Sequence, residues 1–168
     1  MKHFLYGLKA AVMQENKKLI FEFLDLMNRQ KGKYDDLALF ITLSKSFQTE
    51  KRFKEGLFWY DAAIEYSERE ESESLGSKIS SSSSCFNTSL NMAFDSGDRR
   101  HVKKILSDMS SRNLPKDEIT YCTLIFGYAV SFNDLHKAEE VIKEVQESGM
   151  PMTAKLRKKI SMAYHFNK

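Results

Sequence analysis

The side chains that most often carry out chemistry are few in this chain and are widely spaced. Two cysteines, Cys85 and Cys122, and four histidines supply all of its thiols and imidazoles. Zinc sites and activated thiols need such groups at close, regular spacing or beside a base, and the sequence shows no such pattern. Asp95 and Asp98 suggest a metal site, but a helix dipole favours carboxylates at just such a position before a helix. We therefore expect no metal, no cofactor, no small-molecule substrate and no enzymatic activity.

Basic residues form a second group with a chemical use, because Lys and Arg bind phosphate. They recur at one phase of the chain, after a turn: Lys17 and Lys18; Lys51, Arg52 and Lys54; Arg99, Arg100, Lys103 and Lys104; His136 and Lys137. Arg157, Lys158 and Lys159 extend the series near the C-terminus. The series predicts a phosphate-facing edge, and its alternative is a solvated helix face.

Helices are the elements that position these groups. Apolar residues follow one another at three- and four-residue spacing almost throughout, as in Leu19, Phe23 and Leu26. This is the period of a helix with one buried face. Two prolines, seven glycines and few alternating apolar and polar runs argue against a sheet. The sequence predicts an all-α fold.

An internal repeat determines how these helices are arranged. An aromatic residue near a helix start recurs in steps of 36, 46 and 35 residues, at Phe4, Phe40, Phe86 and Tyr121. Two further sets recur in steps of 36, 46 and 36: Ile20, Gly56, Val102 and Ala138; and Met27, Ala63, Met109 and Val145. Because a lone helical pair cannot bury its apolar faces, neighbouring pairs must stack on one another.

The predicted fold is therefore an α-solenoid of about four helix-turn-helix repeats plus a C-terminal capping helix, in a single domain of residues 1–168. The repeats cover about 1–35, 36–67, 83–117 and 118–152, and the capping helix covers 153–168. A Glu/Ser-rich insertion at 68–82 accounts for the one long step. In GLFWYDAAIEY we place Trp59 in the core beside Gly56, with a partner-binding anchor as the alternative.

Two of these units resemble the pentatricopeptide repeat. The unit from Glu118 reads EITYCTLIFGYAVSFNDLHKAEEVIKEVQESGMPM, and the unit before it reads SSCFNTSLNMAFDSGDRRHVKKILSDMSSRNLPKD. The resembling features are TYCTLIFGY at 120–128, the turn at 133–135, and the exit prolines Pro115 and Pro151. Over residues 1–66 the resemblance rests on period and helix pattern. The tetratricopeptide repeat is the nearest alternative, since its helix pairs have a similar period.

The resemblance implies binding of single-stranded RNA, one nucleotide per repeat, along the face lined by first helices. Family members meet a base with the residue after the aromatic and the last residue before the next repeat. Asn87 with Asp117 matches this pair and resembles the family's preference for uridine; Cys122 is matched with Thr153 or Met152. Ile119 matches the apolar residue that wedges between bases. For Asn87 the alternative is a helix-start residue that hydrogen-bonds the backbone.

Other repeats depart from this pattern, since Leu5 and Ile41 offer no hydrogen bond to a base. We therefore expect weak RNA binding by the chain alone, with protein partners in a larger ribonucleoprotein assembly. The alternative is a protein-binding α-solenoid scaffold without direct RNA contact. Apolar Leu5 and Ile41 favour the scaffold for the N-terminal half.

The overall composition limits the partners and the location. Net charge is +3 and pI is about 8.7, which tolerates a polyanion without predicting tight binding by charge alone. No apolar run reaches the ~20 residues of a membrane span, so we expect no membrane insertion. The family resemblance implies a mitochondrion or plastid, although no clear transit peptide is visible; a cytoplasmic location is the alternative.

Overall fold

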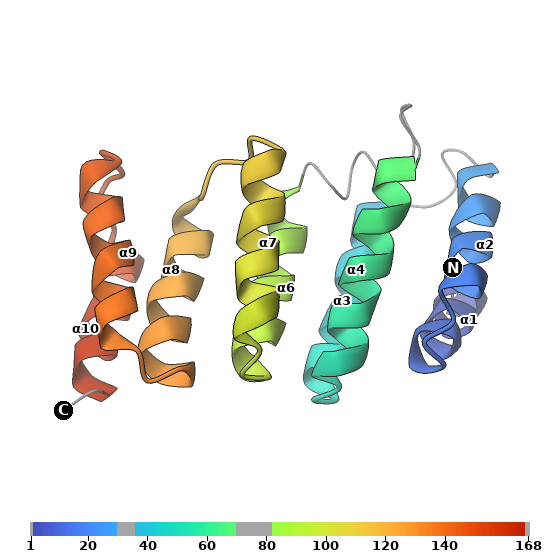
Figure 1. Ribbon diagram of the computed structural model, residues 1–168, viewed down its shortest axis with the longest axis horizontal. Helices are drawn as coiled ribbons and strands as arrows, with labels where there is room; N and C mark the ends of the chain where they lie inside the picture. The colour runs from blue at the N-terminus through green and yellow to red at the C-terminus, as the bar shows by residue number, and fades with distance from the viewer. Residues whose placement is uncertain (1, 30–35, 70–81, 167–168) are drawn as a thin grey trace. The chain divides into compact units, whose positions relative to one another are not determined.

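The computed structural model describes residues 2–29, 36–69 and 82–166, which are mostly helical (Figure 1). Across these three ranges there is no β-strand. The predicted all-α fold, with helix-turn-helix pairs followed by a C-terminal helix, is confirmed. Of the predicted Glu/Ser-rich insertion, Glu68 and Arg69 continue a helix, and residues 70–81 lie outside the described residues.

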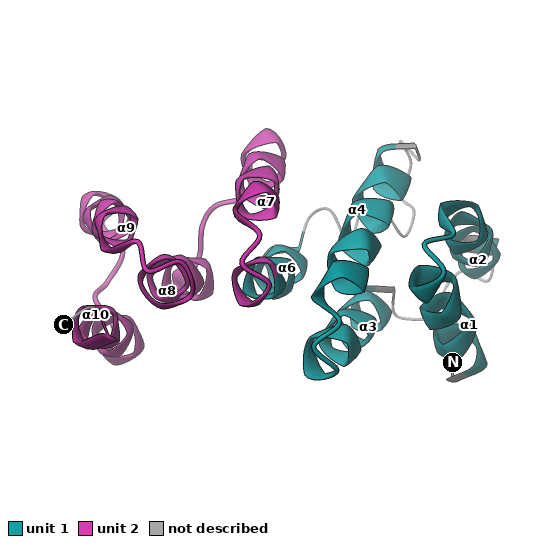
Figure 2. Cartoon of the chain, turned by 60° about the horizontal axis from the view of Figure 1, so that its bottom comes forward, with its two compact units in different colours: residues 1–92 teal, residues 93–168 magenta. Residues whose placement is uncertain are grey.

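Residues 1–92 make up the first of two compact units, drawn in teal in Figure 2. Its helices are α1 (Lys2–Met13), α2 (Lys17–Arg29), α3 (Asp36–Thr49), α4 (Phe53–Arg69) and most of α6 (Ser83–Asp95). Helix α1 pairs with α2 and α3 with α4, and α1 also contacts both helices of the second pair. The Trp59 ring is fully buried and stacks on Phe40 at 5.5 Å between centroids, so its predicted core position is confirmed.

Residues 93–168 make up the second unit, drawn in magenta in Figure 2. Its helices are α7 (Arg99–Ser111), α8 (Glu118–Phe126), the π-helix η1 (Gly127–Ser131), α9 (Leu135–Glu147) and α10 (Ala154–Phe166). Helix α8 packs against both α9 and α10, and η1 continues α8 directly into the turn. The first helix of one pair therefore lies beside the C-terminal helix that follows that pair.

The turn within each helical pair contains a residue in the left-handed conformation. These residues are Glu15, Lys51, Gly97 and Asn133, with φ of 51°, 57°, 74° and 50°. The steps between them are 36, 46 and 36 residues, the same period as in the sequence. In the first three turns the next amide donates to the carbonyl five residues earlier, at 3.0, 2.8 and 2.9 Å: Asn16 to Ala11, Arg52 to Phe47, and Asp98 to Ala93. Such bonds satisfy carbonyls that a helix end leaves open.

The repeating apolar positions are core positions. Every member of the two sets that begin with Ile20 and Met27 is buried. In the aromatic set, Phe40, Phe86 and Tyr121 are buried, and Phe4 is half-buried. The sequence period therefore reports which side of each helix faces its neighbours.

Candidate nucleic-acid interface

Helix α8 carries two of the residues that the family resemblance points to, Ile119 and Cys122, and a third, Asp117, precedes the helix as its N-cap residue. Asp117 accepts hydrogen bonds from the backbone amide of Thr120 at 2.7 Å and from its hydroxyl at 2.8 Å. A carboxylate in this position satisfies an amide that the first turn leaves open. The Asp117 side chain thus has a structural use, which the sequence analysis did not foresee.

Ile119 and Cys122 are three residues apart on α8, a spacing that places them on one side of the helix. Ile119 is 48% exposed, whereas Cys122 is 4% exposed. Burial is the largest cause that raises the pKa of the Cys122 thiol, and the nearby Lys155 ammonium opposes it. The thiol is therefore neutral near pH 7, so it offers a weak donor rather than a charge.

Thr153 joins the end of the α8–α9 pair to the start of α8. Its hydroxyl donates to Glu118 Oε1 at 3.1 Å and accepts from the backbone amide of Leu156 at 3.2 Å. Through the second bond Thr153 caps α10, and through the first it holds α10 at the N-terminal end of α8. Helices α8 and α10 therefore bring Ile119, Cys122 and Thr153 into one region of the second unit.

Cationic and aromatic side chains continue this region toward the C-terminal ends of both helices. The Lys159 ammonium lies over the Phe126 ring, 4.0 Å from its centroid, and Phe126 meets Phe166 edge-on at 6.4 Å. Phe166 is exposed. Helix α10 also carries Lys155, Arg157 and Lys158 and contains no acidic residue. We call Ile119, Phe126, Lys155, Lys159 and Phe166 the α8–α10 face.

Three members of the α8–α10 face, Phe126, Lys155 and Phe166, were missed by reasoning from sequence. Phe126 follows Ile119 by seven residues, so helical spacing alone would have placed both on one side of α8. Lys155 and Phe166 offered no such signal, because their approach to α8 depends on how α10 packs.

The predicted phosphate-facing series divides into paired and unpaired cations. Arg99 donates to Asp134 Oδ2 at 2.9 Å and to the Phe132 carbonyl at 3.1 Å. Lys104 lies 3.7 Å from Asp108. Arg100 and Lys103 are exposed and have no ion-pair partner within residues 2–29, 36–69 and 82–166. Two of the four cations predicted on α7 are therefore available to a ligand without breaking an ion pair.

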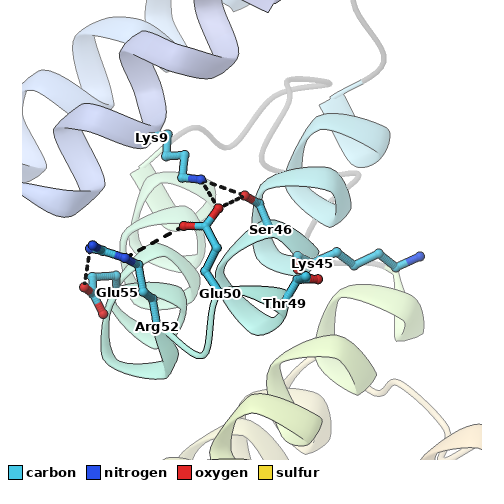
Figure 3. A network of polar contacts seen from close by, with 7 residues as sticks. All are labelled: Lys9, Lys45, Ser46, Thr49, Glu50, Arg52 and Glu55. Atoms are coloured by element: carbon cyan, nitrogen blue, oxygen red, sulfur yellow. Dashed lines mark hydrogen bonds and ion pairs between the residues drawn. The ribbon is translucent and has the colours of Figure 1, made fainter.

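Basic residues of the first unit show the same division. Arg52 pairs with Glu55 at 3.0 Å and lies 3.8 Å from Glu50, which also accepts from Lys9 (Figure 3). Lys17 pairs with Glu65 at 2.8 Å. Lys18, Lys51 and Lys54 are exposed and have no ion-pair partner in the described part of the chain.

Asn87 lies on α6 in the first unit, while the other predicted RNA-binding residues lie in the second. Its side chain is 4% exposed. A base-reading amide needs an accessible edge, so this burial gives no direct support to such a role. The pairing of Asn87 with Asp117 on one base stays a prediction.

The described ranges hold neither of two other classes of site. They contain no group of three or more His, Cys, Asp or Glu residues placed to hold a metal ion. None of the helices in those ranges combines the length and the apolar character that crossing a bilayer requires.

Comparison with known families identifies the repeat. Residues 85–151 match the family model described as the pentatricopeptide repeat domain, which confirms the resemblance over that segment. No curated protein matches the chain. The matched segment includes α7, α8 and α9, and its family consists of helical-repeat proteins that typically bind RNA and are generally non-catalytic.

Proposed function

We propose that this chain is a non-catalytic protein that contacts single-stranded RNA through the α8–α10 face, as a subunit of an organellar ribonucleoprotein assembly. The observation that carries the proposal is the exposure of Ile119, at the position where this family wedges an apolar side chain between bases. A large aliphatic side chain left 48% in water has no role in the core of the unit. Bases stacked against it would remove that surface from water.

The neighbours of Ile119 suit a nucleic acid strand. Aromatic rings such as Phe126 and Phe166 offer surfaces to bases, and stacking tolerates any base because each has a π face. Lys155 and Lys159 provide cations for the phosphates that follow the bases along the strand. Neutral Cys122 contributes little to base choice, so we expect little sequence preference.

Weak binding follows from the number of contacts. Stacking contributes about 1–3 kcal/mol per base, and association costs several kcal/mol before any contact counts. One well-formed face holds only a few nucleotides, so RNA contact by this chain alone is weak. Protein partners that add RNA contacts would supply the remaining affinity. We place such an assembly in the mitochondrion or plastid, the organelles that the family resemblance implies.

A protein-binding scaffold is the second candidate, and helix α1 favours it. Tyr6 is 67% exposed and Met13 is 44% exposed, and their seven-residue spacing places them on one side of the helix. Exposed Tyr and Met side chains are common where proteins bind one another. On this alternative the chain binds a partner through its N-terminal helices and never meets RNA.

The test is fluorescence anisotropy with labelled oligouridine of about ten nucleotides at low salt. Ile119→Ser should lower affinity roughly fivefold to tenfold, because it removes one stacking surface. Leu26→Ser is the matched control, since Leu26 is a similarly exposed aliphatic residue, at 45%, on α2. Leu26→Ser should leave affinity unchanged. Absence of oligouridine binding by the unaltered chain would reject the proposal and leave the scaffold.

A further inference from the structure

A cavity in the second unit shares no lining residue with the α8–α10 face. It has a volume of about 310 Å³ and opens between α7, the π-helix η1 and the first turn of α9. Arg99 and Lys103 line it from α7, and Lys137 lines it from α9. Three cations from two helices thus surround a space large enough for a small anionic group.

Tyr128 gives this cavity a hydroxyl group without a partner. The side chain lines the cavity and is only 8% exposed. Its ring is held edge-on by Phe94 at 5.2 Å and by Phe132 at 6.0 Å. Within the described residues nothing hydrogen-bonds to the hydroxyl. The hydroxyl oxygen is accessible at the cavity wall rather than buried, so it can donate its proton to an acceptor that enters the cavity.

The π-helix η1 explains why the Tyr128 side chain lies at the cavity wall. The Phe132 amide bonds to the Gly127 carbonyl at 3.0 Å, five residues back, so the chain is wider than an α-helix at this point. A Cβ atom at Gly127 would lie 2.3 Å from Cγ of Phe94, so a glycine is needed where the helix approaches that ring. Close approach to Phe94 and the wide turn together hold Tyr128 at the cavity wall.

The charges of the cavity favour an anion. Among the described residues that line it, Asp134 is the one carboxylate, and Arg99 already pairs with it at 2.9 Å. The Arg99 guanidinium also lies 4.4 Å from the centroid of the Phe132 ring, so it is held on two sides. A guanidinium has five N–H donors, and the two bonds to Asp134 and the Phe132 carbonyl leave others for a ligand.

The remaining two cations differ in how they are engaged. Lys137 pairs with Glu140 on its own helix. Lys103 is exposed and has no ion-pair partner in the described part of the chain. The donors that a ligand would meet are therefore the Lys103 ammonium, the Tyr128 hydroxyl and the remaining N–H groups of Arg99.

We propose that this cavity binds a phosphate group. A phosphate has several acceptor oxygens pointing in different directions, which suits donors that approach from α7 and from η1. The phosphate belongs either to an RNA backbone or to a free phosphate-bearing molecule. The site is separate from the RNA contacts proposed on the α8–α10 face and does not depend on them.

The test uses inorganic phosphate and pyrophosphate as probes, with the full chain at low salt. Binding should broaden the ³¹P resonance of the probe as protein is added. Tyr128→Phe keeps the ring and removes the hydroxyl, and Lys103→Gln keeps the side-chain length and removes the charge. Each should weaken binding roughly tenfold, as for a lost hydrogen bond to a charged group. Lys143→Gln is the control, because Lys143 is exposed on α9 and does not line the cavity.

Circular dichroism of each variant shows whether the fold is retained, and Tyr128→Phe conserves the packing of the ring. Displacement of the bound probe by oligouridine would support the site and assign its phosphate to RNA. Retention of the probe in the presence of oligouridine would support a free phosphate ligand. No broadening with the unaltered chain, or equal broadening with the folded Tyr128→Phe and Lys103→Gln variants, would overturn the proposal. This readout needs no RNA, so failure of the proposed RNA contact would not affect it.

Discussion

Glu50 lies at the centre of a polar cluster in the first unit (Figure 3). Its carboxylate accepts from the Lys9 ammonium and, at 3.0 Å, from the Ser46 hydroxyl. Lys9 also donates to Ser46 at 2.8 Å, so one ammonium from α1 meets two groups at the end of α3. The hydrogen bond from Lys9 is the largest cause that lowers the pKa of Glu50, followed by the bond from Ser46. Single side chains thus connect helical pairs in ways that no local pattern encodes.

The first prediction concerns the titration of Glu50. Lys9→Met removes the strongest donor, so the pKa of Glu50 should rise toward that of an ordinary Glu side chain. NMR titration of the Glu50 carboxyl carbon would measure it. Lys45→Met is the matched control, because Figure 3 shows Lys45 pointing away from the cluster. An unchanged pKa in Lys9→Met would contradict the contact.

At the scale of the helix, side chains at the N-terminus determine where several helices begin. Asp98, Asp117 and Asp134 each accept from the backbone amides of the turn that follows. Asp98 was interpreted from sequence as a helix-start carboxylate, and this is confirmed by its bonds to the amides of Arg100 and His101 at 3.0 and 3.1 Å. Its pKa is lowered, first by the hydrogen bond with the His101 ring.

The second prediction follows from that pKa. A lowered folded-state pKa means that Asp98 stabilises the fold above its unfolded value of 3.8, and that this contribution is lost as pH falls through the folded pKa. Asp98→Ala should therefore cost about 1 kcal/mol at pH 7 and less near pH 2. Urea unfolding at both pH values would measure it, with Glu139→Ala as the exposed control on α9. An equal cost at both pH values would count against the cap.

For the whole molecule, the number of cations without a partner matters more than the net charge of +3. Several cations of the repeating series pair with carboxylates from neighbouring helices, as Arg99 does with Asp134 and Lys17 with Glu65. Such pairs contribute little to stability at an exposed surface, but they reduce the field that a polyanion meets.

The third prediction is a shallow salt dependence of oligouridine affinity. Each phosphate neutralised on a single strand contributes about −0.7 to the slope of log affinity against log salt. With Lys155 and Lys159 as the two main contacts, we expect a slope of about −1.4. Oligouridine affinity measured between about 50 and 200 mM salt tests this slope. A slope steeper than about −5 would show that a larger basic surface takes part.

Residue types and their spacing were sufficient to predict the all-α class, the helical pairs and the resemblance confirmed over residues 85–151. They were sufficient because these features are local. Apolar positions such as Ile20 and Met109 recur with the helix period, and left-handed turn residues at Glu15, Lys51, Gly97 and Asn133 recur with the same repeat. A helical pair and its turn are encoded within about 35 residues, where the chain itself keeps the parts together.

Contacts between separate repeats determined which site residues are paired, which are buried and which line a cavity. Arg99 pairs with Asp134, and Cys122 is buried. Tyr128 lines a cavity with Arg99 and Lys103. Each of these facts depends on which side chains from distant segments come within a few ångströms of one another. Helical spacing shows on which side of its own helix a residue lies, but the side chain opposite it is known only when the helices have packed.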